Sequence, residues 1–147
     1  MIRKFIKRLF GKKYEEISFR QSYDLTELAI ITFYQGDNKI NLILDSGSSD
    51  NIIDKSALAK LEYEKVDKEG EIIGLTGNIS KTEVCNLKVT YKNTEYEYPY
   101  MVADLREPFE RLKKTHGVTL HGIIGTNFFN KYKYVLDFEK LVAYSKM

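Results

Sequence analysis

The residues of this chain best suited to chemistry lie at positions 42–49, which read LILDSGSS. The apolar run predicts a buried strand that delivers the carboxylate of Asp45 into a tight turn. Gly47 lets the backbone turn sharply and leaves room beside the acid, and the neighbouring serines could hydrogen-bond it. Because carboxylates with tuned ionisation concentrate at active sites, Asp45 is a candidate catalytic residue.

An Asp-Ser-Gly turn also has a plain structural interpretation. Asp, Ser and Gly are ordinary turn residues, so a strand followed by an Asx turn would explain residues 45–47 without any chemistry. The pattern arises by chance on the order of once per hundred chains of this length. Its meaning therefore depends on the context in which it occurs.

Three blocks downstream supply that context. They are a glycine-containing segment at residues 71–78 (EIIGLTGN), an apolar-apolar-Gly strand at 121–129 (HGIIGTNFF) and a last strand with an Asp at 134–142 (YVLDFEKLV). In this order the blocks resemble the retropepsin-like aspartic proteases. That family has an Asp-Ser/Thr-Gly catalytic turn, a flap hairpin, an apolar-apolar-Gly strand, a short helix and a last strand that carries an Asp. The resemblance covers roughly residues 27–145.

The resemblance implies a reaction and an assembly. The expected function is that of an aspartic endopeptidase, in which one ionised and one protonated carboxylate activate a water molecule against a peptide bond. The chain contains a single Asp-Ser-Gly turn, so the second carboxylate would be Asp45 of an identical subunit in a homodimer. The expected partners are therefore a second copy of the chain and a peptide or protein substrate. No cofactor is expected.

The resemblance also implies roles for the residues that follow Asp45. The Ser46 hydroxyl would bridge the two catalytic turns of the dimer, and Gly47 would pack its backbone against the acid. The Ser48 hydroxyl would donate to the carboxylate. Such a bond favours the charged form of an acid, so it predicts activity at acidic rather than neutral pH.

Two further groups of residues would complete the site. A flap that closes over a bound peptide is expected at Ile73, Gly74, Leu75, Thr76 and Gly77. Support beneath the catalytic turn is expected from Ile123, Ile124 and Gly125. The chain departs from the retropepsin pattern at Thr126, where some retroviral enzymes carry an Arg that braces the dimer. A second departure is a long insertion at residues 104–117.

The rest of the pattern predicts an all-β fold. Short runs rich in β-branched and aromatic residues alternate with turn signals at regular intervals. Residues 96–100 (YEYPY) place three tyrosines on one face of a strand, where cross-strand packing explains them better than binding does. We therefore expect a closed barrel of the acid-protease type with a flap hairpin and one or two short helices. One helical turn is expected at residues 126–131.

Composition narrows the possible functions. The chain has 147 residues, of which 43% are hydrophobic and 13% aromatic, and this suits one folded domain, assigned to residues 14–147. A single cysteine, Cys85, excludes an intrachain disulfide. His116 and His121 lack metal-ligand spacing with each other or with a cysteine, so no metal site is expected.

The charge is distributed unevenly along the chain. The net charge is +2, yet residues 1–13 carry six Lys or Arg and no acid, which leaves 17 basic and 21 acidic residues in the body. An acidic body disfavours nucleic-acid binding. In residues 1–13 the cations alternate with apolar residues at helical spacing, namely Ile2, Phe5, Ile6, Leu9 and Phe10. This pattern predicts a basic amphipathic segment.

Segment 1–13 has three possible interpretations. It could lie on an anionic membrane surface, it could pack on the barrel or be a solvated tail, or it could recognise an acidic partner. It lacks the uninterrupted apolar core of a signal peptide or transmembrane span. The expected location is therefore cytoplasmic, with or without association with a membrane.

The main alternative to an enzyme is a retropepsin-like module without catalysis. Such a barrel would dimerise, or would bind extended peptides by strand addition without cutting them. The intact turn at residues 45–47 favours the enzyme, because a site without catalysis has no physical need for it.

Overall fold

Two β-sheets account for most of the chain in the computed structural model, which describes residues 14–147. The predicted amphipathic segment 1–13 lies outside the described residues. In chain order the strands are β1 (Ile17–Ser18), β2 (Ile30–Gln35), β3 (Asn38–Leu44), β4 (Asn51–Asp54), β5 (Glu64–Ile73), β6 (Ile79–Tyr91), β7 (Thr94–Ala103), β8 (Gly122–Ile124), β9 (Tyr134–Asp137) and β10 (Val142–Ser145).

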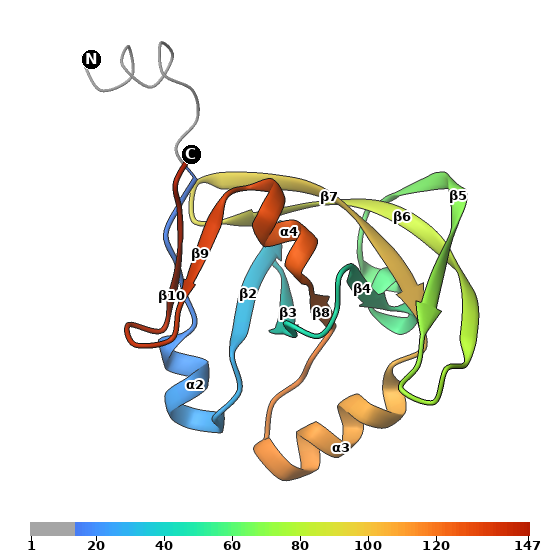
Figure 1. Ribbon diagram of the computed structural model, residues 1–147, viewed down its shortest axis with the longest axis horizontal. Coiled ribbons are helices and arrows are strands. Elements are labelled where there is room, and N and C mark those ends of the chain that lie inside the picture. The colour runs from blue at the N-terminus through green and yellow to red at the C-terminus, as the bar shows by residue number, and fades with distance from the viewer. Residues whose placement is uncertain (1–13) are drawn as a thin grey trace.

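Six strands of the larger sheet form a closed barrel (Figure 1). The sheet order is β2-β3-β8-β4-β7-β6-β5, and β2 also pairs with β6, where Tyr34 lies opposite Thr90. This extra pairing joins the sheet to itself. β5 pairs only with β6 and forms the outer strand of a long hairpin. The prediction of an all-β closed barrel with a hairpin is confirmed.

Aromatic side chains fill the barrel. Tyr96, Tyr98 and Tyr100 alternate along β7 and are all buried, as expected for a strand with one face on the core. The Phe128 ring lies against the rings of Tyr96 and Tyr98, with centroid distances of 5.5 and 5.4 Å. Cys85 belongs to the same core, and burial raises the pKa of its thiol to about 11. A thiol that stays protonated is a poor nucleophile.

The described chain contains more helix than the one or two short helices that the sequence predicted. Its helices are α2 (Arg20–Thr26), the 3-10 helix η1 (Lys55–Lys60), α3 (Arg106–His116) and α4 (Thr126–Lys131). α4 has the predicted bounds. α3 occupies the insertion, where Phe109 is buried and Gly117, with φ of 71°, ends the helix in the left-handed conformation that favours glycine.

A second, smaller sheet joins the two ends of the described chain. Its order is β1-β10-β9, with Ile17 opposite Ala143 and Ala143 opposite Leu136. β10 is thus paired on both sides, whereas β1 and β9 each keep one edge unpaired within this sheet. Within residues 14–147, none of the helices has the length and apolar character needed to cross a bilayer.

Candidate active site

Asp45 directly follows β3 and begins a tight turn. The N–H of Ser48 donates to the carbonyl of Asp45 over 3.1 Å, and the N–H of Gly47 donates to Asp45 Oδ1 over 2.9 Å. A Cβ added at Gly47 would stand 3.2 Å from the same oxygen, so glycine lets the backbone approach the acid. Asp45, Ser46 and Gly47 are exposed in the single chain. The carboxylate is therefore open to a ligand or to a second chain.

Backbone hydrogen bonds clamp the Asp45 turn to the junction of β8 and α4. Gly125 at this junction is buried, as is Ile124, whereas Ile123 is half-buried. Ile124 and Gly125, two of the three residues expected to support the turn, thus lie directly against it, whereas Ile123 is paired with Ile43. The clamp consists of three N–H···O bonds: Asp45 to Ile124 (3.1 Å), Thr126 to Ser48 (2.9 Å) and Asn127 to Ser49 (2.9 Å).

The Ser48 side chain is directed away from Asp45. Its hydroxyl donates to the carbonyl of Asp50 over 2.7 Å, and a hydroxyl has one proton to donate. The prediction that Ser48 bonds the Asp45 carboxylate is therefore wrong. The chain bends after Ser48 and brings the carbonyl of Asp50 within reach of the hydroxyl. Without a bond from Ser48 to the carboxylate, this residue gives no reason to expect an acidic pH optimum.

Asn51 belongs to the site and was missed from the sequence. It begins β4, is fully buried, and its Oδ1 accepts the N–H of Gly125 over 2.8 Å. This bond satisfies a buried donor at the point where β8 passes into α4, and it ties that junction to the end of the loop after Asp45. The sequence did carry one indication of this role: Asn51 is a polar residue at the start of the apolar run at residues 51–53, where a buried polar side chain needs a hydrogen-bond partner.

The β5–β6 turn occupies the position predicted for the flap. The N–H of Gly74 donates to the carbonyl of Asn78 over 2.8 Å, and Gly77 has a φ of 85° that favours glycine. Three apolar side chains at this turn are exposed: Leu75 fully, Ile73 to 68% and Ile79 to 62%. No hydrogen bond within residues 14–147 joins this turn to the Asp45 turn, so closure over a ligand stays a prediction.

His121 holds the start of β8 in place without acting at the site. Its Nδ1 accepts the N–H of Asn41 over 2.9 Å, and its carbonyl accepts the N–H of Asp54 over 2.8 Å. Burial lowers the pKa of His121, an effect that nearby Asp54 opposes and Lys60 reinforces. A protonated imidazole carries a hydrogen on both nitrogens, so charging His121 would break the bond from Asn41.

This arrangement predicts lower stability at mildly acidic pH. Below about pH 6.5 the unfolded chain binds a proton at His121 that the folded chain excludes. The free energy of unfolding should therefore fall as the pH drops through this range, and it should level off below the lower folded-state pKa. Denaturant unfolding at about pH 7 and about pH 5 measures the effect.

The matched variant for this test is His121→Asn, which keeps an acceptor but does not titrate. We expect a weaker pH dependence of stability in His121→Asn than in wild type. If wild type and His121→Asn lost the same stability between the two pH values, the assignment of the effect to His121 would be wrong.

A closed β-barrel whose Asp-Ser-Gly turn is clamped to an apolar-apolar-Gly strand is the architecture of retropepsin-like aspartic proteases. Residues 31–128, more than half of the chain, match the aspartyl protease family, and the chain belongs to this family. Comparison with curated protein sequences gives no significant match.

Two solved structures share this fold. A retropepsin-like aspartic protease from Rickettsia conorii is 18% identical, with a TM-score of 0.53 over 89% of this chain and 99% of that chain. The retroviral protease-like domain of Ddi1 from Leishmania major is 12% identical, with a TM-score of 0.52 over 80% of this chain and 86% of that chain. At such identities the likeness concerns the fold.

Proposed function

We propose that the chain is an aspartic endopeptidase whose active form is a homodimer with one Asp45 from each subunit. The observation that carries the proposal is the Asp45 turn itself. Its carboxylate is exposed, while its backbone is fixed by the bonds to Ile124, Thr126 and Asn127. An accessible acid on a rigid support is what positioning for catalysis requires.

Three other acids take part in bonds within the single chain. Asp50, in the loop after Asp45, accepts the Ser49 hydroxyl and the Asn127 side-chain amide. Asp137 accepts the N–H groups of Glu139 and Lys140 and so serves the turn between β9 and β10. Asp54, at the far end of β4, is 6% exposed. In the proposed dimer the second carboxylate is Asp45 of the other subunit, since each residue near a two-fold axis meets its own copy.

In the proposed reaction the two Asp45 carboxyls share one proton, because two like charges at short distance do not both ionise readily. The ionised group takes a proton from water as the water oxygen attacks the peptide carbonyl carbon. The protonated group gives its proton to the carbonyl oxygen. Collapse of the tetrahedral intermediate then breaks the C–N bond. The amine nitrogen takes the proton that the first carboxylate gained from water, and the second carboxylate takes a proton from a diol hydroxyl as the C=O bond re-forms.

The terminal sheet limits how two copies could pair by strands. Among residues 14–147, β10 has partners on both sides, so the unpaired edges of this sheet belong to β1, with two residues, and β9, with four. Antiparallel pairing of β9 with its own copy would extend the sheet across a two-fold axis and satisfy the open edge. The apolar β5–β6 turn is a second surface that a partner or substrate would cover.

The test is the concentration dependence of peptide cleavage, measured alongside sedimentation of the same samples. Turnover per chain should fall as dilution takes the protein below its dimer dissociation constant. A pepstatin-type inhibitor, whose central hydroxyl takes the place of the attacking water, should bind the dimer and stop cleavage. Constant turnover per chain for a monomer would contradict the two-carboxylate mechanism.

The alternative is a retropepsin-like module that dimerises or binds peptides without cleavage. It predicts peptide binding, detectable by fluorescence anisotropy, with no product at any protein concentration or pH. The exposed carboxylate of Asp45 is the observation that favours the enzyme over this alternative.

A further inference from the structure

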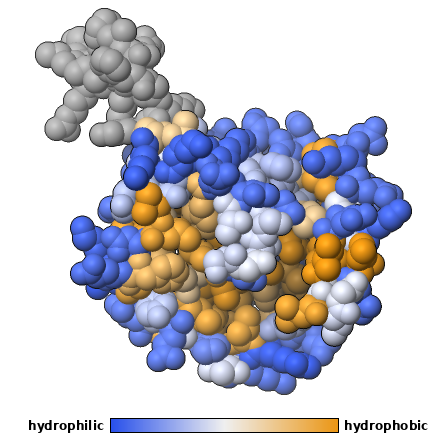
Figure 2. Space-filling view, in the orientation of Figure 1, coloured by the Kyte–Doolittle hydropathy of each residue, from blue (hydrophilic) through white to orange (hydrophobic). Residues whose placement is uncertain are grey.

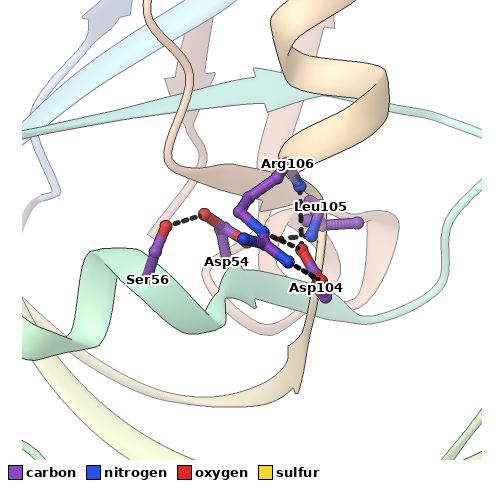
Figure 3. Close-up of polar contacts among 5 residues, drawn as sticks. All are labelled: Asp54, Ser56, Asp104, Leu105 and Arg106. Carbon is purple, nitrogen blue, oxygen red and sulfur yellow. Dashed lines mark hydrogen bonds and ion pairs between the residues drawn. The ribbon is translucent and has the colours of Figure 1, made fainter.

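The insertion that the sequence could not explain is anchored to the barrel through a buried carboxylate (Figure 3). Asp54 Oδ1 accepts the N–H of Leu105 over 2.8 Å, and Asp54 Oδ2 accepts the hydroxyl of Ser56. Arg106 pairs with Asp104 over 3.0 Å at the same point. The start of α3 is thus fixed to the end of β4, and the helix is not a loosely attached appendage.

One face of α3 packs on the outside of the barrel. Leu105, Phe109 and Leu112 recur at helical spacing. Phe109 is 8% exposed and forms an apolar cluster with Ile30 of β2 and Leu120. Leu105 and Leu112 pack against this cluster but stay partly exposed.

The same cluster reaches the strand that ends just before Asp45. Ile43 of β3 and Ile123 of β8 are paired across the strands, and both pack against the cluster. Asp45 directly follows β3 and lies two residues beyond Ile43, so the cluster ends close to the Asp45 turn. Two residues along a strand span about 7 Å.

On the face of the molecule shown in Figure 2, hydrophobic surface gathers between α4 and α3 and over the β5–β6 turn. We propose that α3 forms a wall of the substrate groove beside Asp45, and that Leu112 and its neighbours select a bulky apolar residue next to the scissile bond. This inference rests on the proposed protease function. It assigns the insertion a role in specificity, with peptide substrates of that class as the occupant of the apolar surface.

Apolar contacts of this kind discriminate by size. One methylene group more or less in a hydrophobic pocket changes kcat/KM on the order of tenfold or more. The wall would therefore act on the ratio of rates for large and small apolar residues, and it would leave the chemical step at Asp45 unchanged.

The experiment compares Leu112→Ala, Leu112→Phe and wild type on a peptide mixture in which the residue next to the scissile bond varies from Ala to Phe. Leu112→Ala should shift the preference towards larger residues by about tenfold, and Leu112→Phe should shift it towards smaller ones. Lys113→Ala is the matched control, because Lys113 is the adjacent exposed residue of α3. Its preference should equal that of wild type.

The outcomes separate this inference from the function on which it rests. If wild type cleaves no peptide, the proposed function fails. If wild type cleaves and both Leu112 variants fold and dimerise but keep the wild-type preference, the proposed role of α3 in substrate selection is overturned. It is also overturned if the variants weaken the dimer by sedimentation while the preference stays unchanged, since the surface would then be a subunit contact.

Discussion

The Asp45→Asn variant should lose about a thousandfold or more of the peptide hydrolysis rate while keeping its fold and its dimer. Asn has nearly the same shape as Asp, so the N–H of Gly47 still finds an acceptor at the side-chain oxygen. The amide neither takes a proton from water nor donates one as an acid does. A single general acid or base contributes about 10²- to 10⁴-fold, and this substitution removes both from a homodimer.

The measurement is the rate of peptide cleavage, with circular dichroism and sedimentation to establish that fold and assembly persist. Asp37→Asn is the matched control, because Asp37 is an exposed acid in the turn before β3, at the opposite end of that strand from Asp45. It should retain wild-type activity. Full activity in the Asp45→Asn variant would show that Asp45 is not the catalytic carboxylate.

Mixing the two proteins gives a sharper test of the shared site. In an equal mixture that has exchanged subunits, about a quarter of the dimers carry two aspartates, by random pairing around the two-fold axis. The wild-type chains in the mixture should then give about half the activity that they have alone. If each subunit carried a complete site, adding the Asp45→Asn chain would leave that activity unchanged.

Local pattern was sufficient to predict the tight turn at Asp45 and the main elements around it. The apolar run before Asp45, the alternating tyrosines of β7 and the bounds of α4 each follow from residues close together in sequence. Hydrophobic periodicity and turn chemistry act over such short ranges. The order of these elements along the chain then indicated the barrel.

Contacts between distant residues could not be predicted in this way. The bond from Gly125 to the Asn51 side chain joins residues 74 positions apart, and nothing near Asn51 indicates its partner. The Ser48 hydroxyl has several acceptors within reach of a short turn, and its choice of Asp50 depends on the conformation of the whole loop. Such side-chain bonds compete with one another.

Two elements had weak local signals. α2 has no buried residue, so it lacks an apolar stripe; its position depends on Ser22, whose hydroxyl bonds the backbone of Leu28 and Ile30. Residues 64–70 of β5 are mostly charged, which is typical of a loop. They form a strand because β6 supplies a partner, and charge along an unpaired strand edge discourages aggregation.

The second large effect is expected at Gly125, where the turn and its support meet most closely. A Cβ at this position would stand 2.5 Å from the Asp50 carbonyl oxygen and 2.7 Å from that of Ser48. Both atoms belong to backbone, so the loop after Asp45 must shift to admit even an alanine. Overpacking of this kind costs about 1–3 kcal/mol of stability.

Gly125→Ala should therefore reduce peptide cleavage by about a hundredfold, because a displacement of about 1 Å at a catalytic group has an effect of that size. Gly36→Ala separates this loss from instability. Gly36 has a φ of 58° with no atom within 4 Å of an added Cβ, so an alanine there is strained and destabilises the fold. Gly36 lies in the turn between β2 and β3, at the opposite end of β3 from Asp45. Activity per folded molecule should be retained in Gly36→Ala and lost in Gly125→Ala. Equal activity of the two variants would mean that the clamp between β8, α4 and the Asp45 turn stabilises the fold without positioning the carboxylate.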